Sequence, residues 1–406
     1  MKKMFFIIML MSAIIAFPSC EILNNDENHL SDKHQSRISL SEVSYILASV
    51  PLTCKQVEEV YDAVTASASN GYDEEYTMKN LFSAPGAGVG DEETRSSVGY
   101  DEPLSRLIRE HIMNMERTKS SVSMTVDRLG AEGFLEALEE SDIQIYWPFS
   151  ENHSSDMLPV ITFDPEDGSE VNIGYRMIDG GDGFRYVEEV MVDEAFAEAN
   201  PVWVVNRNSD AEYASLEMLR REDPEWGAGG GNIIVNPLRS RTGTMGDKFK
   251  TLILRDFTMK RNYDSWLAGA SEFFVKVGSV EDFTASTEAE MRLYTPSVTD
   301  FMIVVKRGQV GKVIPFNAVL VSDWSDQMTH CAFMITEDDG GTITDWDCKA
   351  LVRVASKSYG VEIKIPFNSR DDVVWRGQLA STWLESNSNR VAHFGDVDLT
   401  FEVVEY

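Results

Sequence analysis

The run Glu272-Phe-Phe-Val-Lys-Val277 decides the fold class, because it is one of a series of short aromatic and β-branched runs in the C-terminal part of the chain. Runs of this composition and length, separated by charged or glycine-containing turns, are typical of β-strands. The other members of the series are Thr251–Arg255, Phe301–Lys306, Phe316–Val321, Cys331–Ile335, Val361–Ile365 and Val397–Val403. Many short strands joined by turns predict an antiparallel β-sandwich over residues 248–406.

The preceding part of the chain predicts helices first and strands afterwards. Apolar residues at spacings of three and four indicate helices at Ile38–Ala68, with a break at Pro51, and at Pro103–Lys119 and Ala131–Glu140. Strand-like runs follow at 143–147, 159–163, 171–178, 186–192 and 202–205. We therefore expect an α+β domain over residues 38–224. The fold class predicted for the whole chain is α+β: a helical N-terminal region with a small β region, followed by the sandwich.

A glycine-rich stretch separates the two predicted domains. Residues 225–247 contain Gly227-Ala-Gly-Gly-Gly231 and lack apolar periodicity. A phosphate-binding loop is excluded, because no Gly-Lys-Ser/Thr follows and the GxGxxG spacing is absent. We interpret residues 225–247 as a linker, since glycine gives a chain conformational freedom.

The N-terminus carries an export signal. Two lysines at residues 2 and 3 precede the apolar run Met4–Ala16, which is too short to span a bilayer. A small residue, Ser19, then precedes Cys20. This start resembles the signal of bacterial lipoproteins, most closely those of the Bacteroidota type, although Phe17 stands where an aliphatic residue is usual.

That resemblance implies how the N-terminal residues are processed. Residues 1–19 would be removed as a signal peptide, and Cys20 would become an N-terminus that carries palmitate and further acyl chains. Residues 20–37, which are polar and acidic, would form a tether. The exported protein would then be anchored to the cell envelope at the outer membrane, with cell-surface exposure as one arrangement. The alternative is an ordinary cleaved signal peptide with an incidental Cys20.

The chain is strongly acidic. It has 67 Asp and Glu against 36 Lys and Arg, a formal net charge of −31, and loss of the two signal lysines makes this −33 (34 − 67). Such a charge repels nucleic acid and anionic lipid surfaces, which argues against both as partners. It also leaves carboxylates that could hold hard cations. The plainer interpretation is a solvated acidic surface without a ligand.

Three cysteines remain besides Cys20. They are Cys54, Cys331 and Cys348. In an exported protein Cys331 and Cys348 are candidates for a disulfide, and two buried thiols fit the sequence equally well. No CxxC pair occurs and only His330 lies near them, which argues against a zinc site.

Acidic residues gather in two predicted loops of the sandwich. One loop follows the strand that ends in Leu254-Arg-Asp256, and the other follows Phe333-Met-Ile-Thr. In strand order and in the placement of these acids, residues 248–406 resemble C2 domains, which are eight-stranded sandwiches whose end loops bind calcium. The resemblance implies a calcium site made by Asp256 and Asp264 from one loop and by Glu337, Asp339 and Asp345 from the other.

No catalytic motif stands out. The chain contains neither a GxSxG nucleophile elbow nor an HExxH zinc motif. We predict a lipid-anchored envelope or cell-surface protein that acts by binding or display, with an envelope protein or a glycan as its partner. The alternative is a secreted hydrolase that acts on polysaccharide with loop carboxylates.

Overall fold

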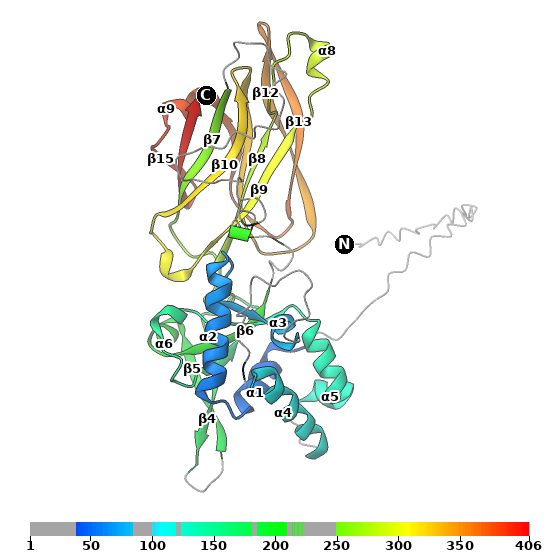
Figure 1. Cartoon of the computed structure of the whole chain (residues 1–406), viewed down its shortest axis with the longest axis vertical. Helices are drawn as coiled ribbons and strands as arrows, with labels where there is room; N and C mark the ends of the chain where they lie inside the picture. Colours follow the sequence, from blue (N-terminus) through cyan, green and yellow to red (C-terminus); the bar gives the residue numbers. More distant parts are fainter. Residues whose placement is uncertain are drawn as a thin grey trace, which may run out of the picture. The chain divides into compact units, whose positions relative to one another are not determined.

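The computed structural model describes residues 38–83, 100, 102–118, 123–180, 185–208, 213, 215, 217–218, 221 and 249–405. The predicted signal peptide, Cys20, the tether and the glycine-rich linker lie outside these residues. The chain from Ile38 onward belongs to one unit, and many of its elements are labelled in Figure 1. The predicted α+β fold class is confirmed: helices with a small mixed sheet come first, and antiparallel sheets follow.

A six-stranded mixed sheet forms the centre of the N-terminal region. In spatial order its strands are β1 (Glu75–Thr77), β2 (Ile143–Tyr146), β6 (Val202–Arg207), β3 (Val160–Phe163), β4 (Val171–Asp179) and β5 (Arg185–Asp193). Strands β3 and β6 are parallel, and the other neighbours are antiparallel. Strands β2, β3 and β6 are almost wholly buried, as expected of central strands covered on both faces.

Helices accompany this sheet. They are α1 (Leu40–Ser49), α2 (Cys54–Ser69), α3 (Met78–Phe82), α4 (Leu104–Thr118), α5 (Met124–Glu139) and α6 (Glu194–Ala199), with a short 3-10 helix η2 at Ser150–Asn152. Helix α1 lies against β3, β4 and β6, and the core of this region includes the fully buried Trp147 and Trp203. No helix in the described part of the chain is long and apolar enough to cross a bilayer.

Local sequence explains where these helices begin and end. Helix α1 ends at Ser49, just before the predicted break at Pro51. Helix α2 begins after Thr53, whose side chain forms a capping box with Gln56. Helix α5 starts earlier than predicted because two helical segments meet at Gly130, whose φ of 75° is readily adopted only by glycine.

Two antiparallel sheets make up the C-terminal region. The first has the order β10 (Ile314–Ser325), β7 (Phe249–Met259), β16 (Val397–Glu405) and β15 (Val391–Phe394). The second has the order β13 (Lys357–Asn368), β12 (Ile343–Val354), β11 (Met328–Glu337), β8 (Ser271–Ser279) and β9 (Ser297–Val305), and β14 (Asp372–Ala380) also pairs with β11. Short helices α8 (Glu288–Met291), η3 (Arg307–Gln309) and α9 (Ser381–Ser386) lie between strands.

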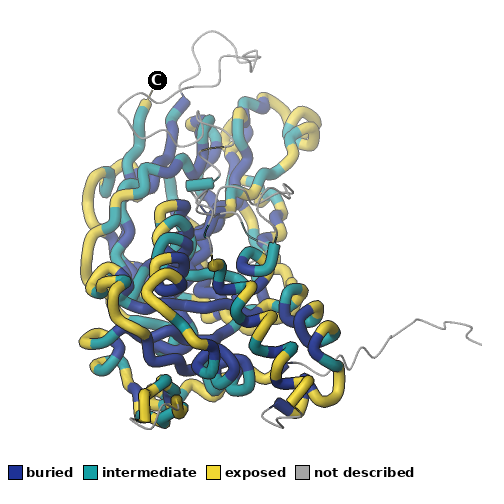
Figure 2. The backbone as a smooth tube through the Cα atoms, turned by 60° about the horizontal axis from the view of Figure 1, so that its bottom comes forward, coloured by how far each residue is buried: buried dark blue, intermediate teal, exposed yellow. Residues whose placement is uncertain are grey.

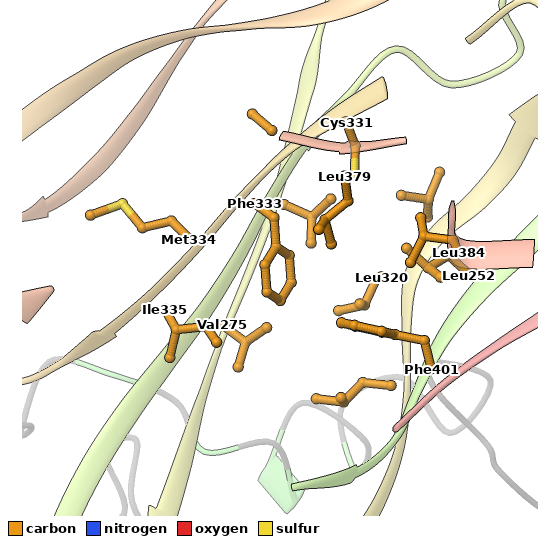
Figure 3. Packing of buried hydrophobic residues seen from close by; sticks show 14 of the residues in the cluster. Leu252, Val275, Leu320, Cys331, Phe333, Met334, Ile335, Leu379, Leu384 and Phe401 are labelled. Carbon is orange, nitrogen blue, oxygen red and sulfur yellow. The ribbon is translucent and has the colours of Figure 1, made fainter. Parts of the chain in front are cut away.

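One hydrophobic core joins these two sheets. It contains Phe333 of β11, whose ring centroid lies 5.6 Å from those of Phe394 and Phe401 and 5.9 Å from that of Trp375. Figure 3 shows the Phe333 ring extending from β11 toward Leu320 and Phe401, which belong to the other sheet. Because burial of one such side chain stabilises a fold by about 1.5–3 kcal/mol, these contacts account for the packing of the sheets.

The β7–β8 connection brings a second apolar group into the N-terminal region. Trp266 and Leu267 are fully buried in a cluster with Tyr146, Val160 and Val204 of the mixed sheet. The Trp266 Nε1 atom also donates a hydrogen bond to the Glu170 carbonyl at 2.9 Å. The two regions therefore share buried surface, and Figure 2 shows buried stretches (dark blue) in strands of both.

The described cysteines Cys54, Cys331 and Cys348 are free thiols. Strands β11 and β12 pair His330 with Leu351, so Cys331 and Cys348 are not opposite one another. Cys331 is buried in the core beside Leu379 (Figure 3). Cys348, on β12, is half-buried.

Candidate functional site

Three carboxylates meet at one end of the second C-terminal sheet. Asp264 lies in the β7–β8 connection, Glu272 is the second residue of β8, and Glu337 is the last residue of β11. One possible ligand oxygen from each lies within 4.8 Å of the other two. We call these three residues the acid triad.

Strand register brings the acid triad together. Strands β8 and β11 are antiparallel and pair Phe273 with Glu337, so the start of one strand lies beside the end of the other. The Asp338 amide then donates to the Glu272 carbonyl at 2.9 Å. Arg307 Nη1 donates to the Asp264 carbonyl at 2.9 Å, which fixes the backbone that carries the third carboxylate.

Burial dominates the electrostatics of the acid triad. The Glu337 side chain is 1% exposed, and burial, followed by the neighbouring Asp264 carboxyl, raises the pKa of Glu337 to about 12. Burial also raises the pKa of Asp264 to about 6, against a hydrogen bond from Glu337 that lowers it. At neutral pH the two carboxyls therefore share one proton, which Glu337 holds and directs at Asp264.

Two oxygens of the acid triad lack other donors. Apart from the shared proton, Oε1 of Glu337 and Oδ2 of Asp264 are buried and receive no hydrogen bond from the described residues. A buried carboxylate oxygen without a donor is unfavourable by several kcal/mol in an apolar setting. Only a proton or a cation can balance this pair.

Further acids surround the acid triad on the β11–β12 and β13–β14 connections. Asp338 accepts a hydrogen bond from Asn368 Nδ2 at 2.8 Å, and its Oδ2 is buried without a donor. Burial, together with the neighbouring Asp338, raises the pKa of Asp371 to about 6. Burial and then the neighbouring acids also raise the pKa of Asp339. This end of the sheet is therefore rich in unfavourable negative charge.

Arg307 is a buried positive charge close to the acid triad. Its side chain is 6% exposed, and its Nε donates to Glu194 Oε1 of helix α6 at 2.7 Å. Arg307 lowers the pKa of Asp264, but less than burial raises it. Since Arg307 already forms an ion pair with Glu194, it leaves the acid triad short of positive charge.

The geometry fits a metal ion. The 4.8 Å limit on the oxygen separations is about twice the Ca–O distance of 2.3–2.6 Å, so one ion could contact all three side chains. Three carboxylates supply up to six oxygens if each binds through both. Among the residues that the structure describes, the acid triad is therefore a group that could hold a metal ion.

Of the five predicted calcium ligands, Asp264 and Glu337 belong to the acid triad. Asp339 lies next to it, in the connection after β11, and is exposed. Asp256 lies inside β7, which continues to Met259 and pairs Asp256 with Pro315 and Thr400. Asp345 lies inside β12, with Lys364 Nζ 3.6 Å from its carboxylate. Because both strands extend beyond their predicted ends, Asp256 and Asp345 are not loop residues.

Glu272 is the member of the acid triad that the sequence analysis missed. It begins an apolar run and was assigned to the strand rather than to the loop before it. Its side chain is only 9% exposed, although acids are rarely buried unless they are paired or bind a cation. A charged residue directly before Phe273-Phe-Val275 was the available signal.

No protein-family model matches the chain. No curated protein and no solved structure matches it either.

Proposed function

We propose that this chain is a lipid-anchored protein of the bacterial cell envelope that acts by binding or display, and that its acid triad binds calcium. The observation that carries the calcium proposal is the buried Glu337–Asp264 pair, in which Glu337 Oε1 and Asp264 Oδ2 receive no hydrogen bond from the described residues other than a shared proton. The resemblance of residues 248–406 to C2 domains supports the same ion. The lipoprotein-like signal supports an extracytoplasmic location, where calcium-binding modules operate at about 10⁻⁴–10⁻³ M.

Calcium suits this site better than magnesium. Magnesium requires near-octahedral geometry at about 2.0–2.1 Å and gives up its waters reluctantly, so it usually retains several of them. Glu337 is 1% exposed and Glu272 is 9% exposed, which leaves little room for a hydrated ion. Calcium accepts irregular sets of oxygens, including carboxylates that bind through both atoms.

The test measures calcium binding by calorimetry and by thermal unfolding in calcium or in chelator. At a hundredfold excess over its Kd, calcium should stabilise the folded protein by about 2.7 kcal/mol. The Glu337→Gln variant should lose this response. The matched control is Asp345→Asn, an acid of the neighbouring strand β12 outside the acid triad, and it should respond like the parent. A parent protein with no calcium-dependent rise in Tm contradicts the calcium proposal.

The lipid anchor has an independent test. Acylation of Cys20 should place the protein in the membrane fraction, and labelled palmitate should mark it. The Cys20→Ala variant should be released and unlabelled, because a free chain lacks the burial of about 0.8 kcal/mol per CH₂. A variant that stays with membranes, beside a parent that never takes up label, shows that Cys20 is incidental.

Hydrolysis of polysaccharide remains the competing proposal, since Asp264 and Glu337 have pKa values far apart, as the acid and base of a glycosidase do. The deep burial of Glu337 argues against the hydrolase, because a side chain that is 1% exposed cannot reach a glycosidic oxygen. Activity toward polysaccharide that disappears in Glu337→Gln and persists in Asp345→Asn would favour the hydrolase.

A further inference from the structure

The chain between two members of the acid triad forms a buried contact with the N-terminal region. Asp264 and Glu272 are joined by residues 265–271, and Trp266 and Leu267 in this segment are fully buried. Their cluster partners, including Tyr146 and Val204, belong to the mixed sheet. We call residues 264–270 the docking loop.

Polar contacts along the docking loop lead to the same region. Trp266 Nε1 donates to the Glu170 carbonyl at 2.9 Å, and Ala270 N donates to Asp73 Oδ2 at 3.0 Å. The Leu267 carbonyl accepts from Asn206 Nδ2 at 3.2 Å. These acceptors and donors lie in separate elements, so the loop is held along its length.

Asp264 itself joins the two sets of contacts. Its carbonyl accepts from Arg307, which is ion-paired with Glu194 of helix α6. Its carboxylate belongs to the acid triad. The residue at the start of the docking loop is therefore linked to the N-terminal region by its main chain, through Arg307, and belongs to the acid triad by its side chain.

We infer that a cation in the acid triad holds the docking loop against the mixed sheet, so that ion binding and the attachment of the two regions are coupled. This inference rests on the proposed calcium site. An ion that contacts Asp264, at the start of the docking loop, and Glu272, two residues after its end, holds the two ends of this segment together. It thereby reduces the conformations open to an undocked loop.

Coupling between two sites is reciprocal. If calcium favours the docked loop by a given factor, then a change that undocks the loop must weaken calcium binding, by up to that factor when undocking is complete. The change need not touch a ligand of the ion. Trp266→Phe is such a change, because it shortens the buried side chain and removes the hydrogen bond to the Glu170 carbonyl.

Hydrogen exchange and calorimetry on the full chain test this coupling. Calcium should slow exchange of the Ala270 amide roughly fivefold or more relative to chelator, and Trp266→Phe should raise the calcium Kd by a similar factor. The matched control is Trp324→Phe. Trp324 is also buried and also donates through Nε1 to a carbonyl, that of Met328, but it lies within the C-terminal core. The control should leave the calcium Kd unchanged.

The outcomes separate this inference from the proposed function. A parent that shows no calcium binding overturns both. Calcium binding with unchanged Ala270 exchange overturns the coupling alone, and this measurement needs no variant. An equal calcium Kd in the parent and a folded Trp266→Phe variant overturns the coupling as well.

Discussion

Asp73 and Glu74 in the N-terminal region are buried about as deeply as Glu337 in the C-terminal sheets, but their surroundings differ. Asp73 and Glu74 are each 3% exposed, and Glu337 is 1% exposed. Asp73 accepts hydrogen bonds from the amides of Ala270 at 3.0 Å and Glu74 at 2.7 Å. Glu74 Oε1 accepts from Lys306 Nζ at 2.8 Å. The protein thus supplies donors and a cation to this pair.

The neighbouring charge decides how far burial moves each pKa. Burial raises the pKa of Glu74 to about 8, with Lys306 opposing the rise. Burial raises the pKa of Glu337 to about 12, with Asp264 adding to the rise. This fold can therefore bury a carboxylate, Glu74, beside a lysine of its own, Lys306. Among the described residues no lysine bonds Glu337 or Asp264, and an external cation is the natural substitute.

The largest expected effect concerns the pH dependence of Glu74. Its pKa is raised in the folded state, so its contribution to stability is complete below the unfolded value of about 4.5 and is lost as pH rises through about 8. The free energy of unfolding should fall by about 1.4 kcal/mol per pH unit across that window, about 5 kcal/mol in total. Urea unfolding of parent and Glu74→Gln at several pH values measures the difference.

The control for this prediction is an acid in an exposed ion pair. Glu385 bonds Lys250 Nζ at 2.7 Å, and Glu385→Gln should keep the pH slope of the parent. Parallel curves for Glu74→Gln and the parent would mean that Glu74 titrates alike in the folded and unfolded states. The contrast with Glu337 would then lose its basis.

The second prediction concerns Lys306, the cation that distinguishes the surroundings of Glu74 from those of Glu337. Lys306→Met leaves Glu74 and Asp73 without their nearest positive charge, which should destabilise the protein by about 2 kcal/mol at pH 8. This expected loss of stability is smaller than that for a fully buried ion pair, because the Lys306 side chain is 27% exposed and solvent screens its charge. In a Glu74→Gln background most of this loss should vanish. Urea unfolding of the parent, the two single variants and the double variant measures this difference in a double-mutant cycle. An equal loss in both backgrounds contradicts the pairing of Lys306 with Glu74.

Sequence patterns predict the apolar strands of this fold better than its exposed ones. The seven apolar runs correspond to β7, β8, β9, β10, β11, β13 and β16. Strands β12 and β14 were not predicted, because their exposed positions carry residues such as Asp345, Asp347 and Arg376 that also occur in turns. What holds such strands is pairing with neighbours distant in sequence, and no local pattern encodes that pairing.

The acid triad was predictable only in part for a related reason. Asp264 and Glu337 could be predicted because Asp264 lies between two recognisable apolar runs and Glu337 lies just after another. Asp256 and Asp345 were misplaced because an apolar run shows where a strand is, but not how far its hydrogen bonds continue. Glu272 was missed because its role depends on the register that sets Phe273 opposite Glu337. Register is set by the whole sheet rather than by local sequence.

The smallest expected effect is that of Glu337→Gln on stability in chelator, and it distinguishes Glu337 from Glu74 most sharply. Because Glu337 is protonated at pH 7, the neutral amide of Glu337→Gln replaces a neutral acid of nearly the same shape. The amide can donate to Asp264 as the acid does, so in chelator the free energy of unfolding should change by less than about 0.5 kcal/mol. The same variant should lose calcium stabilisation, since an amide is a poorer ligand than a carboxylate. Urea unfolding in chelator measures the first effect, and a loss of 2 kcal/mol or more there would mean that Glu337 is ionised and balanced by the protein itself, as Glu74 is.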